Sequence, residues 1–321
     1  VDLLPRTATN IGLGNSAISG EFDISDTELD RIRISGDLTI GNNLTSQVTM
    51  DNFSYTYANP NSPLIINALA ADGNILVENS YSYSWGETYL NANEGVTLNN
   101  HFYTHELTYI NADADADGSG IFTMGASSRL YSYGSNIEIK ADSLSLAGNI
   151  ETAGGDLTLL PSDGANIEIG DSNELNTFHI SQASFSKLYT DKLYIGNTNS
   201  GYIRVDNLGA SFSNGINEEV ILQAHNDDAD VRFIGEGSTF NRLQVQADNG
   251  IQVNADLTTD VGILSLDGDY DDTVDTADGI ITAADVIIKS EGDMTLESEN
   301  GAITTQGILS LESDNAIKDR K

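Results

Sequence analysis

Short apolar runs with a period of two dominate this chain. In residues 155–190, three of these runs occupy 157–159, 167–169 and 178–180, and Gly, Pro, Asp, Asn or Ser lies between them. Successive side chains of an extended segment point to opposite faces, so each run gathers its apolar residues on one face of a strand. Because turn residues end every run before it reaches the length of a helix, the pattern predicts an all-β fold.

The opening of the chain returns about 156 residues later. Residues 11–14 match residues 167–170 at an offset of 156, and residues 38–42 match residues 193–197 at an offset of 155. The offset changes only between runs, as expected, because a slip within a strand would turn its side chains to the wrong face. Self-similarity of this kind indicates a repeat architecture with two copies of one long unit.

A parallel β-helix, or β-solenoid, suits this pattern best. We expect copy 1 to span about 4–159 and copy 2 about 160–321, with residues 1–321 forming one continuous solenoid. A β-sandwich would close at about 100 residues, and a propeller repeats blades of about 40–50 residues; neither period is found. Coils of roughly 20–28 residues would give roughly thirteen coils, with ladders of Leu, Ile and Val inside.

The charge of the chain excludes several classes of partner. Asp and Glu number 49 against 14 Lys and Arg, which gives a net charge of −35 at pH 7. Nucleic acid and anionic membranes both need a basic surface, so neither is an expected partner. The chain has no Cys and therefore no disulfide scaffold, and it has no apolar run long enough to span a membrane. Since Val1 opens directly on a repeat motif, we interpret the chain as a processed or excised part of an exported, extracellular protein.

Strands that open on glycine suggest a family. The motifs are GDLTL at 155–159, GVTLN at 95–99, PSDGANIEIGD at 161–171, KLYIGNTNSGYIRV at 192–205 and the Asp-rich turn NADADADGSG at 111–120. Together they resemble the filamentous-haemagglutinin-like repeats of giant secreted bacterial surface proteins. The resemblance implies a right-handed parallel β-helix, export, and a structural or adhesive role at the bacterial cell surface.

Acid-rich loops occupy equivalent places in the two copies. The carboxylates in question are Asp113, Asp115, Asp117, Asp267, Asp269 and Asp271. In the first copy the acids alternate before Gly118, as at the start of an EF-hand calcium loop, but Met124 stands where that loop needs a bidentate Glu. Calcium binding is one interpretation of both loops, and a solvated acidic turn is the other.

One short segment alternates aromatic and small residues. Tyr81, Tyr83 and Trp85 are separated by Ser82 and Ser84. On a strand, three rings would therefore share one face. A row of exposed rings can stack on sugars or bind a protein partner, whereas rings that pack inward would only support the core.

Signals of catalysis are sparse. The chain has no GxSxG elbow and no HExxH motif. Its basic residues are scattered, and Arg31 and Arg33 form one of the few close pairs. We expect a non-enzymatic structural or adhesive β-solenoid segment of a large bacterial cell-surface protein. Its partners would be other copies of itself, neighbouring solenoid segments, or a cell-surface glycan or protein. The alternatives are a self-assembling subunit of an extracellular filament or surface layer, and a polysaccharide-binding or polysaccharide-cleaving β-helix protein.

Overall fold

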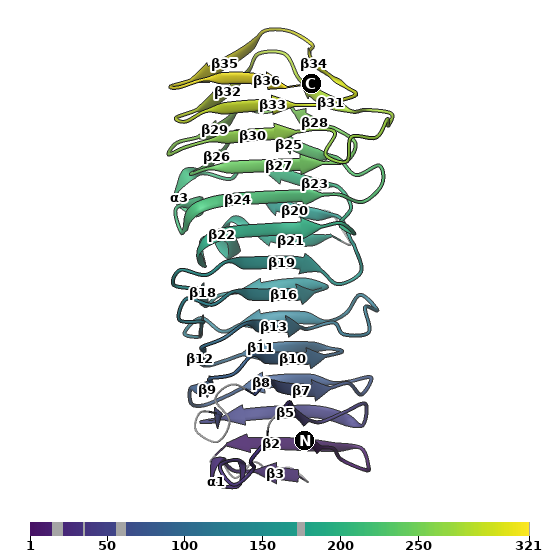
Figure 1. The fold of residues 1–321 in the computed structure, drawn as a ribbon, viewed down its shortest axis with the longest axis vertical. Coiled ribbons are helices and arrows are strands. Elements are labelled where there is room, and N and C mark those ends of the chain that lie inside the picture. The colour runs from purple at the N-terminus through teal and green to yellow at the C-terminus, as the bar shows by residue number, and fades with distance from the viewer. Residues whose placement is uncertain (15–21, 35, 56–61, 172–176, 321) are drawn as a thin grey trace. The chain divides into compact units, whose positions relative to one another are not determined.

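The computed structural model describes residues 1–14, 22–34, 36–55, 62–171 and 177–320 (Figure 1). The chain divides into two compact units. Unit 1 comprises Val1–Thr158 and Lys187–Thr190, and unit 2 comprises Leu159–Ser186 and Asp191–Lys321. Strands β19 (Leu157–Pro161) and β22 (Leu188–Asn197) hold residues of both units. The prediction of one continuous solenoid over the whole chain stays a prediction.

Unit 1 has three faces of parallel strands, which we name 1A, 1B and 1C. Face 1A contains β1 (Asp2–Leu3), β4 (Leu38–Ile40), β7 (Leu64–Ala68), β10 (Thr88–Ala92), β13 (Thr108–Asn111) and β16 (Ile137–Ala141). Face 1B contains β2 (Thr9–Gly14), β5 (Thr45–Asp51), β8 (Asn74–Val77), β11 (Gly95–Leu98), β14 (Ile121–Met124) and β17 (Ser143–Leu146). Face 1C contains β6 (Ser54–Tyr55), β9 (Ser82–Ser84), β12 (Phe102–Thr104), β15 (Arg129–Tyr131) and β18 (Asn149–Glu151).

Unit 2 repeats this plan with faces that we name 2A, 2B and 2C. Face 2A contains β24 (Ile216–Ala224), β27 (Leu243–Ala247), β30 (Leu264–Asp267), β33 (Met294–Glu297) and β36 (Ile317–Arg320). Face 2B contains β20 (Ile167–Gly170), β23 (Ile203–Asp206), β25 (Val231–Ile234), β28 (Ile251–Val253), β31 (Gly279–Thr282) and β34 (Ala302–Thr305). Face 2C contains β26 (Ser238–Phe240), β29 (Leu257–Thr259), β32 (Val286–Ser290) and β35 (Leu309–Ser313).

The register of neighbouring coils builds the core as ladders of like side chains. On face 1A the fully buried ladder is Ile40, Ile66, Leu90, Ile110 and Ile139. On face 2B the fully buried ladder is Ile167, Ile203, Val231, Ile251 and Ile280. Each coil buries its apolar residues only against the coils beside it, so stability accumulates coil by coil. The prediction of an all-β, parallel β-helical fold is confirmed.

Coil length varies along each unit. Registered positions 38, 64, 88, 108 and 137 on face 1A make coils of 26, 24, 20 and 29 residues. Registered positions 220, 243, 264, 294 and 317 on face 2A make coils of 23, 21, 30 and 23 residues. Among these coils, the longest of each unit contains its acid-rich loop, so the loop lengthens the coil that carries it.

Each unit also contains one extra strand and one turn of helix at equivalent places. Strand β3 (Phe22–Ile24) pairs with β2, and β21 (Phe178–Ser181) pairs with β20. A single helical turn follows each strand, α1 (Asp26–Leu29) or α2 (Gln182–Phe185). Seryl side chains cap both turns, which satisfies a backbone N–H at each helix start. The third short helix is α3 (Ala210–Ser213).

Among the described residues, no helix has the length and apolar character needed to cross a membrane.

Candidate functional site

A column of three tyrosines lies on the outer side of face 1C. Tyr83 lies in β9 between Ser82 and Ser84, whose side chains are fully buried, so its ring points outward. Tyr103 in β12 is in register with Tyr83, and Tyr131 in β15 is in register with Tyr103. The winding therefore brings together three rings that are far apart in the sequence.

The rings contact one another directly. The ring centroids of Tyr83 and Tyr103 lie 4.9 Å apart with planes inclined by 19°, and those of Tyr103 and Tyr131 lie 6.3 Å apart, edge to face. Tyr81 packs edge-on against Tyr83 at 5.3 Å. These are the arrangements that aromatic pairs prefer. Arg129 adds a cation over the ring of Tyr131 at 4.1 Å and forms an ion pair with Glu151.

A second column runs beside the first. The ring of His105 lies 4.7 Å from that of Trp85, and on its other side it stacks on Tyr133 at 4.3 Å with an angle of 7°. Burial lowers the pKa of His105 and so favours the neutral ring, while the nearby charge of Glu106 acts in the opposite direction. Tyr81, Trp85 and Tyr133 remain 49%, 43% and 49% exposed. The ring of His101 packs edge-on against Tyr103 at 5.8 Å. We call the whole set the aromatic face: Tyr81, Tyr83, Trp85, His101, Tyr103, His105, Tyr131 and Tyr133.

The structure thus places the three rings singled out in the sequence on the outside of unit 1. Sequence reasoning missed Tyr131 and Tyr133, although a signal was present: Tyr-Ser-Tyr at 131–133 repeats Tyr-Ser-Tyr at 81–83. It also missed His105, because only the winding of the coils reveals that this ring lies between Trp85 and Tyr133.

The acid-rich loop of unit 1 is built round a buried aspartate. Asp113 is fully buried, and its two carboxylate oxygens accept hydrogen bonds from the backbone N–H groups of Asp117 and Gly118, each at 3.3 Å. Carboxylate oxygens of Asp113, Asp115 and Asp117 all lie within 4.8 Å of one another. Burial and the neighbouring carboxylate of Asp117 raise the pKa of Asp115. The three predicted residues are therefore brought together, and calcium binding by them stays a prediction.

The acid-rich loop of unit 2 has a different grouping. Asp271 lies with Asp248 and Asp275, whose carboxylate oxygens are also within 4.8 Å of one another, whereas Asp267 and Asp269 lie outside this group. Burial, with nearby Asp271 and Asp275 adding to it, raises the pKa of Asp248 to about 6. Burial also raises the pKa of Asp267 to about 6. Sequence reasoning missed Asp248, since it belongs to the preceding coil.

Replacing Asp248 tests the cost of burying its charge beside the other carboxylates. A carboxyl whose pKa is raised in the folded state holds its proton there while the unfolded chain has released it, so it favours folding at low pH and loses this contribution as the pH rises through about 6. We expect Asp248→Asn to raise the melting temperature at pH 7 and to leave it nearly unchanged at pH 4. Melting curves at four pH values check this. A difference that is constant with pH, or a lower melting temperature at pH 7, would contradict it.

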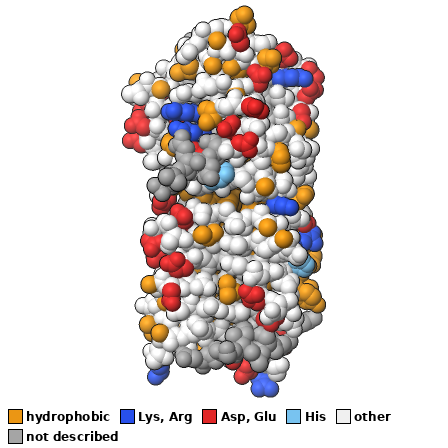
Figure 2. Space-filling model, turned by 180° about the vertical axis from the view of Figure 1, so that it is seen from behind, with side chains coloured by type: hydrophobic (Ala, Val, Ile, Leu, Met, Phe, Trp, Pro, Cys, Tyr) orange, Lys and Arg blue, Asp and Glu red, His pale blue; other side chains and the backbone are white. Residues whose placement is uncertain are grey.

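Acidic side chains outnumber basic side chains in this chain. Figure 2 shows acidic side chains scattered over the visible face, with basic side chains at fewer places, as expected from a net charge of −35. Arg31 and Arg33 follow α1, and the guanidinium of Arg33 bends back to donate a hydrogen bond to the carbonyl of Asp30. That side chain supports the end of the helical turn.

Comparisons with known proteins add no identification. Scans against family models, curated proteins and solved structures found no match for this chain.

Proposed function

We propose that this chain is a non-enzymatic structural and adhesive β-solenoid segment of a large bacterial cell-surface protein, and that the aromatic face is where it holds a glycan. The observation that carries the proposal is the pair of ring columns on face 1C, with Tyr81, Trp85 and Tyr133 still 43–49% exposed. Sugar rings present C–H groups that pack on the faces of Tyr and Trp, and tyrosyl hydroxyls supply hydrogen bonds at the edge.

The chemistry of the aromatic face favours a glycan over other partners. Rings held side by side by strand pairing lose little entropy on binding, because their positions are fixed before the ligand arrives. Nucleic acid would also stack on such rings, but a net charge of −35 opposes a polyanion. Each contact of this kind is weak, and a segment with several contacts, or several segments on one surface, gains affinity through multivalency.

The proposal predicts that glycan binding depends on two exposed rings at one edge of the aromatic face, Tyr81 and Trp85. We expect the double variant Tyr81→Ala/Trp85→Ala to bind about tenfold more weakly than the parent chain, because stacking contributes about 0.5–1.5 kcal/mol per ring. An array of neutral and acidic cell-surface glycans identifies the ligand, and calorimetry measures its affinity.

Tyr189→Ala is the matched control. Tyr189 lies in β22, is 45% exposed and is outside the aromatic face, so its removal should leave glycan binding unchanged. The absence of binding to any glycan, or equal binding by the double variant and the parent chain, would refute the proposed role of the aromatic face.

A further inference from the structure

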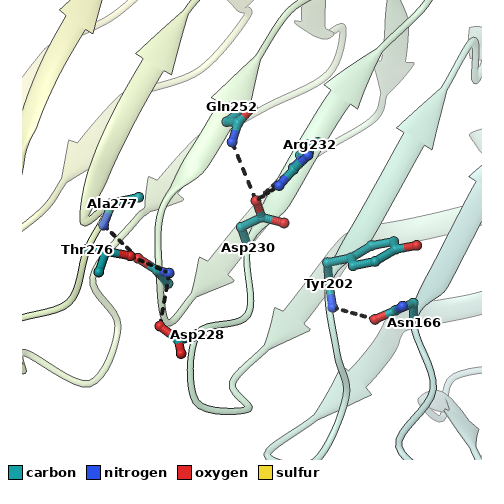
Figure 3. Close-up of polar contacts among 9 residues, drawn as sticks. Asn166, Tyr202, Asp228, Asp230, Arg232, Gln252, Thr276 and Ala277 are labelled. Carbon is teal, nitrogen blue, oxygen red and sulfur yellow. Dashed lines mark hydrogen bonds and ion pairs between the residues drawn. The ribbon is translucent and has the colours of Figure 1, made fainter.

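A polar groove of about 420 Å³ lies in unit 2, at the start of neighbouring strands of face 2B (Figure 3). The side chains of the lining that concern us are those of Asn166, Tyr202, Asp230, Arg232, Asn249 and Gln252. The loop 226–229 forms one wall, and it turns through Asp228, whose φ is 67°. A volume of this size falls within the range of small-ligand sites.

The winding of the coils, rather than any local motif, assembles the groove. On face 2B, Arg204 is in register with Arg232, and Arg232 is in register with Gln252. Asn166 and Tyr202 precede the neighbouring strands β20 and β23. Each coil therefore contributes one or two polar side chains to the same concave surface.

The polar side chains are held in place by one another. One carboxylate oxygen of Asp230, Oδ2, accepts hydrogen bonds from Arg232 Nε at 2.7 Å and from Gln252 Nε2 at 3.4 Å, and it also pairs with Arg232 Nη2 at 2.5 Å. In Figure 3 the dashed lines from both donors end on this oxygen, and none reaches the second oxygen of Asp230. The carboxylate is thus fixed in orientation while one oxygen stays available as an acceptor.

The opposite side of the groove supplies a ring and a donor. The guanidinium of Arg204 lies over the Tyr202 ring at 4.4 Å and also pairs with the fully buried Glu168 at 3.6 Å, which holds the ring. The side-chain oxygen of Asn166 accepts a hydrogen bond from the backbone N–H of Tyr202 at 3.2 Å, and the side-chain nitrogen is the group of this amide that can donate a hydrogen bond.

We propose that this groove binds a neutral saccharide unit. Fixed hydrogen-bond acceptors and donors on either side of an aromatic ring match the alternating hydroxyl groups and C–H faces of a sugar. The two arginines are already paired with carboxylates, and Asp227 and Asp228 line the rim, so the groove repels an acidic sugar. This site is separate from the aromatic face of unit 1, and its existence does not depend on that face.

Ligand-observed and protein-observed NMR on the full chain, titrated separately with glucose, galactose, mannose and N-acetylglucosamine, test the proposal. We expect saturable binding of at least one sugar, with shifts at the side-chain amides of Asn166 and Gln252. Asp230→Asn should weaken that binding about tenfold, since it removes a charge-assisted acceptor while keeping the shape. Gly201→Ala should weaken it as well, because a Cβ at this position would lie 2.2 Å from Asn166 Oδ1.

Tyr81→Ala/Trp85→Ala is the control that separates the two sites, and it should leave binding in the groove unchanged. No binding of any of the four sugars, or equal affinity in Asp230→Asn, would overturn the proposal. So would shifts at the groove on addition of calcium alone without any on addition of sugar, because they would identify a cation site. If Asp230→Asn fails to fold, Gln252→Ala replaces it, with the same expected loss and the same overturning result.

Discussion

Replacing Gly14 or Gly170 with alanine is expected to destabilise its unit by more than about 3 kcal/mol. Gly14 ends β2 and Gly170 ends β20, at equivalent places in the two repeat copies. Both have a positive φ, 105° at Gly14 and 99° at Gly170. A Cβ at Gly14 would lie 2.1 Å from the carbonyl oxygen of Asp51, and a Cβ at Gly170 would lie 1.8 Å from the carbonyl oxygen of Asp206. In each case the oxygen belongs to the backbone of the next coil, which cannot move without breaking the ladder.

Gly154→Ala isolates the backbone part of this effect within unit 1, and the difference from Gly14→Ala gives the steric part. Gly154 also has a positive φ, 113°, but a Cβ there would meet no atom within 4 Å. Only the backbone penalty then applies, about 1–2 kcal/mol. Chemical denaturation of the three variants measures the losses. Similar losses for Gly14→Ala and Gly154→Ala would contradict the close approach of neighbouring coils.

Replacing Phe102 with alanine is expected to cost about 3–5 kcal/mol of unfolding free energy. Phe102 is fully buried, in register with Leu130 on the next coil, so its removal leaves a cavity in the core of unit 1. Tyr103→Ala, one residue along β12, should cost only about 1 kcal/mol, because its ring packs on the outer face.

This pair tests the inside–outside alternation that builds the aromatic face. Urea unfolding, followed by the circular dichroism of the strands, gives both values. A larger loss for Tyr103→Ala than for Phe102→Ala would mean that β12 is turned the other way, with its tyrosine inside.

The strands themselves were predictable because their signal is local. Ile11 and Leu13, or Ile167 and Ile169, alternate with small or polar residues, and a single strand is enough to show which side chains face inward. The repeat was predictable for the same reason. Gly14 and Gly170 recur at the same place because both copies must meet the same backbone of the next coil.

The sites were less predictable, because they depend on which coils become neighbours. The sequence indicated that Tyr81, Tyr83 and Trp85 share a face. Only the lengths of the intervening coils, which differ from one coil to the next, decide that Tyr103 and Tyr131 lie beside them. The same holds for Asp248, which joins Asp271 and Asp275 from the previous coil, and for the groove of unit 2, whose lining comes from separate coils.

Engineered disulfides test the stacking of the coils most directly, since the chain has no native cysteine. Thr97 and Thr123 face outward at paired positions of β11 and β14, and Ser145 occupies the next position on β17. Adjacent strands lie about 4.8 Å apart, within reach of a disulfide, whereas positions two strands apart lie beyond it.

Thr97→Cys/Thr123→Cys should therefore oxidise readily to an intramolecular disulfide, and Thr97→Cys/Ser145→Cys should not. In unit 2, Gln244→Cys/Ser265→Cys should close, and Gln244→Cys/Thr295→Cys should stay reduced, by the same register. Disulfide formation in both adjacent pairs and in neither control is the predicted result. Closure of the controls as readily as the adjacent pairs, or of none of the four, would contradict the stacking of parallel coils in both units.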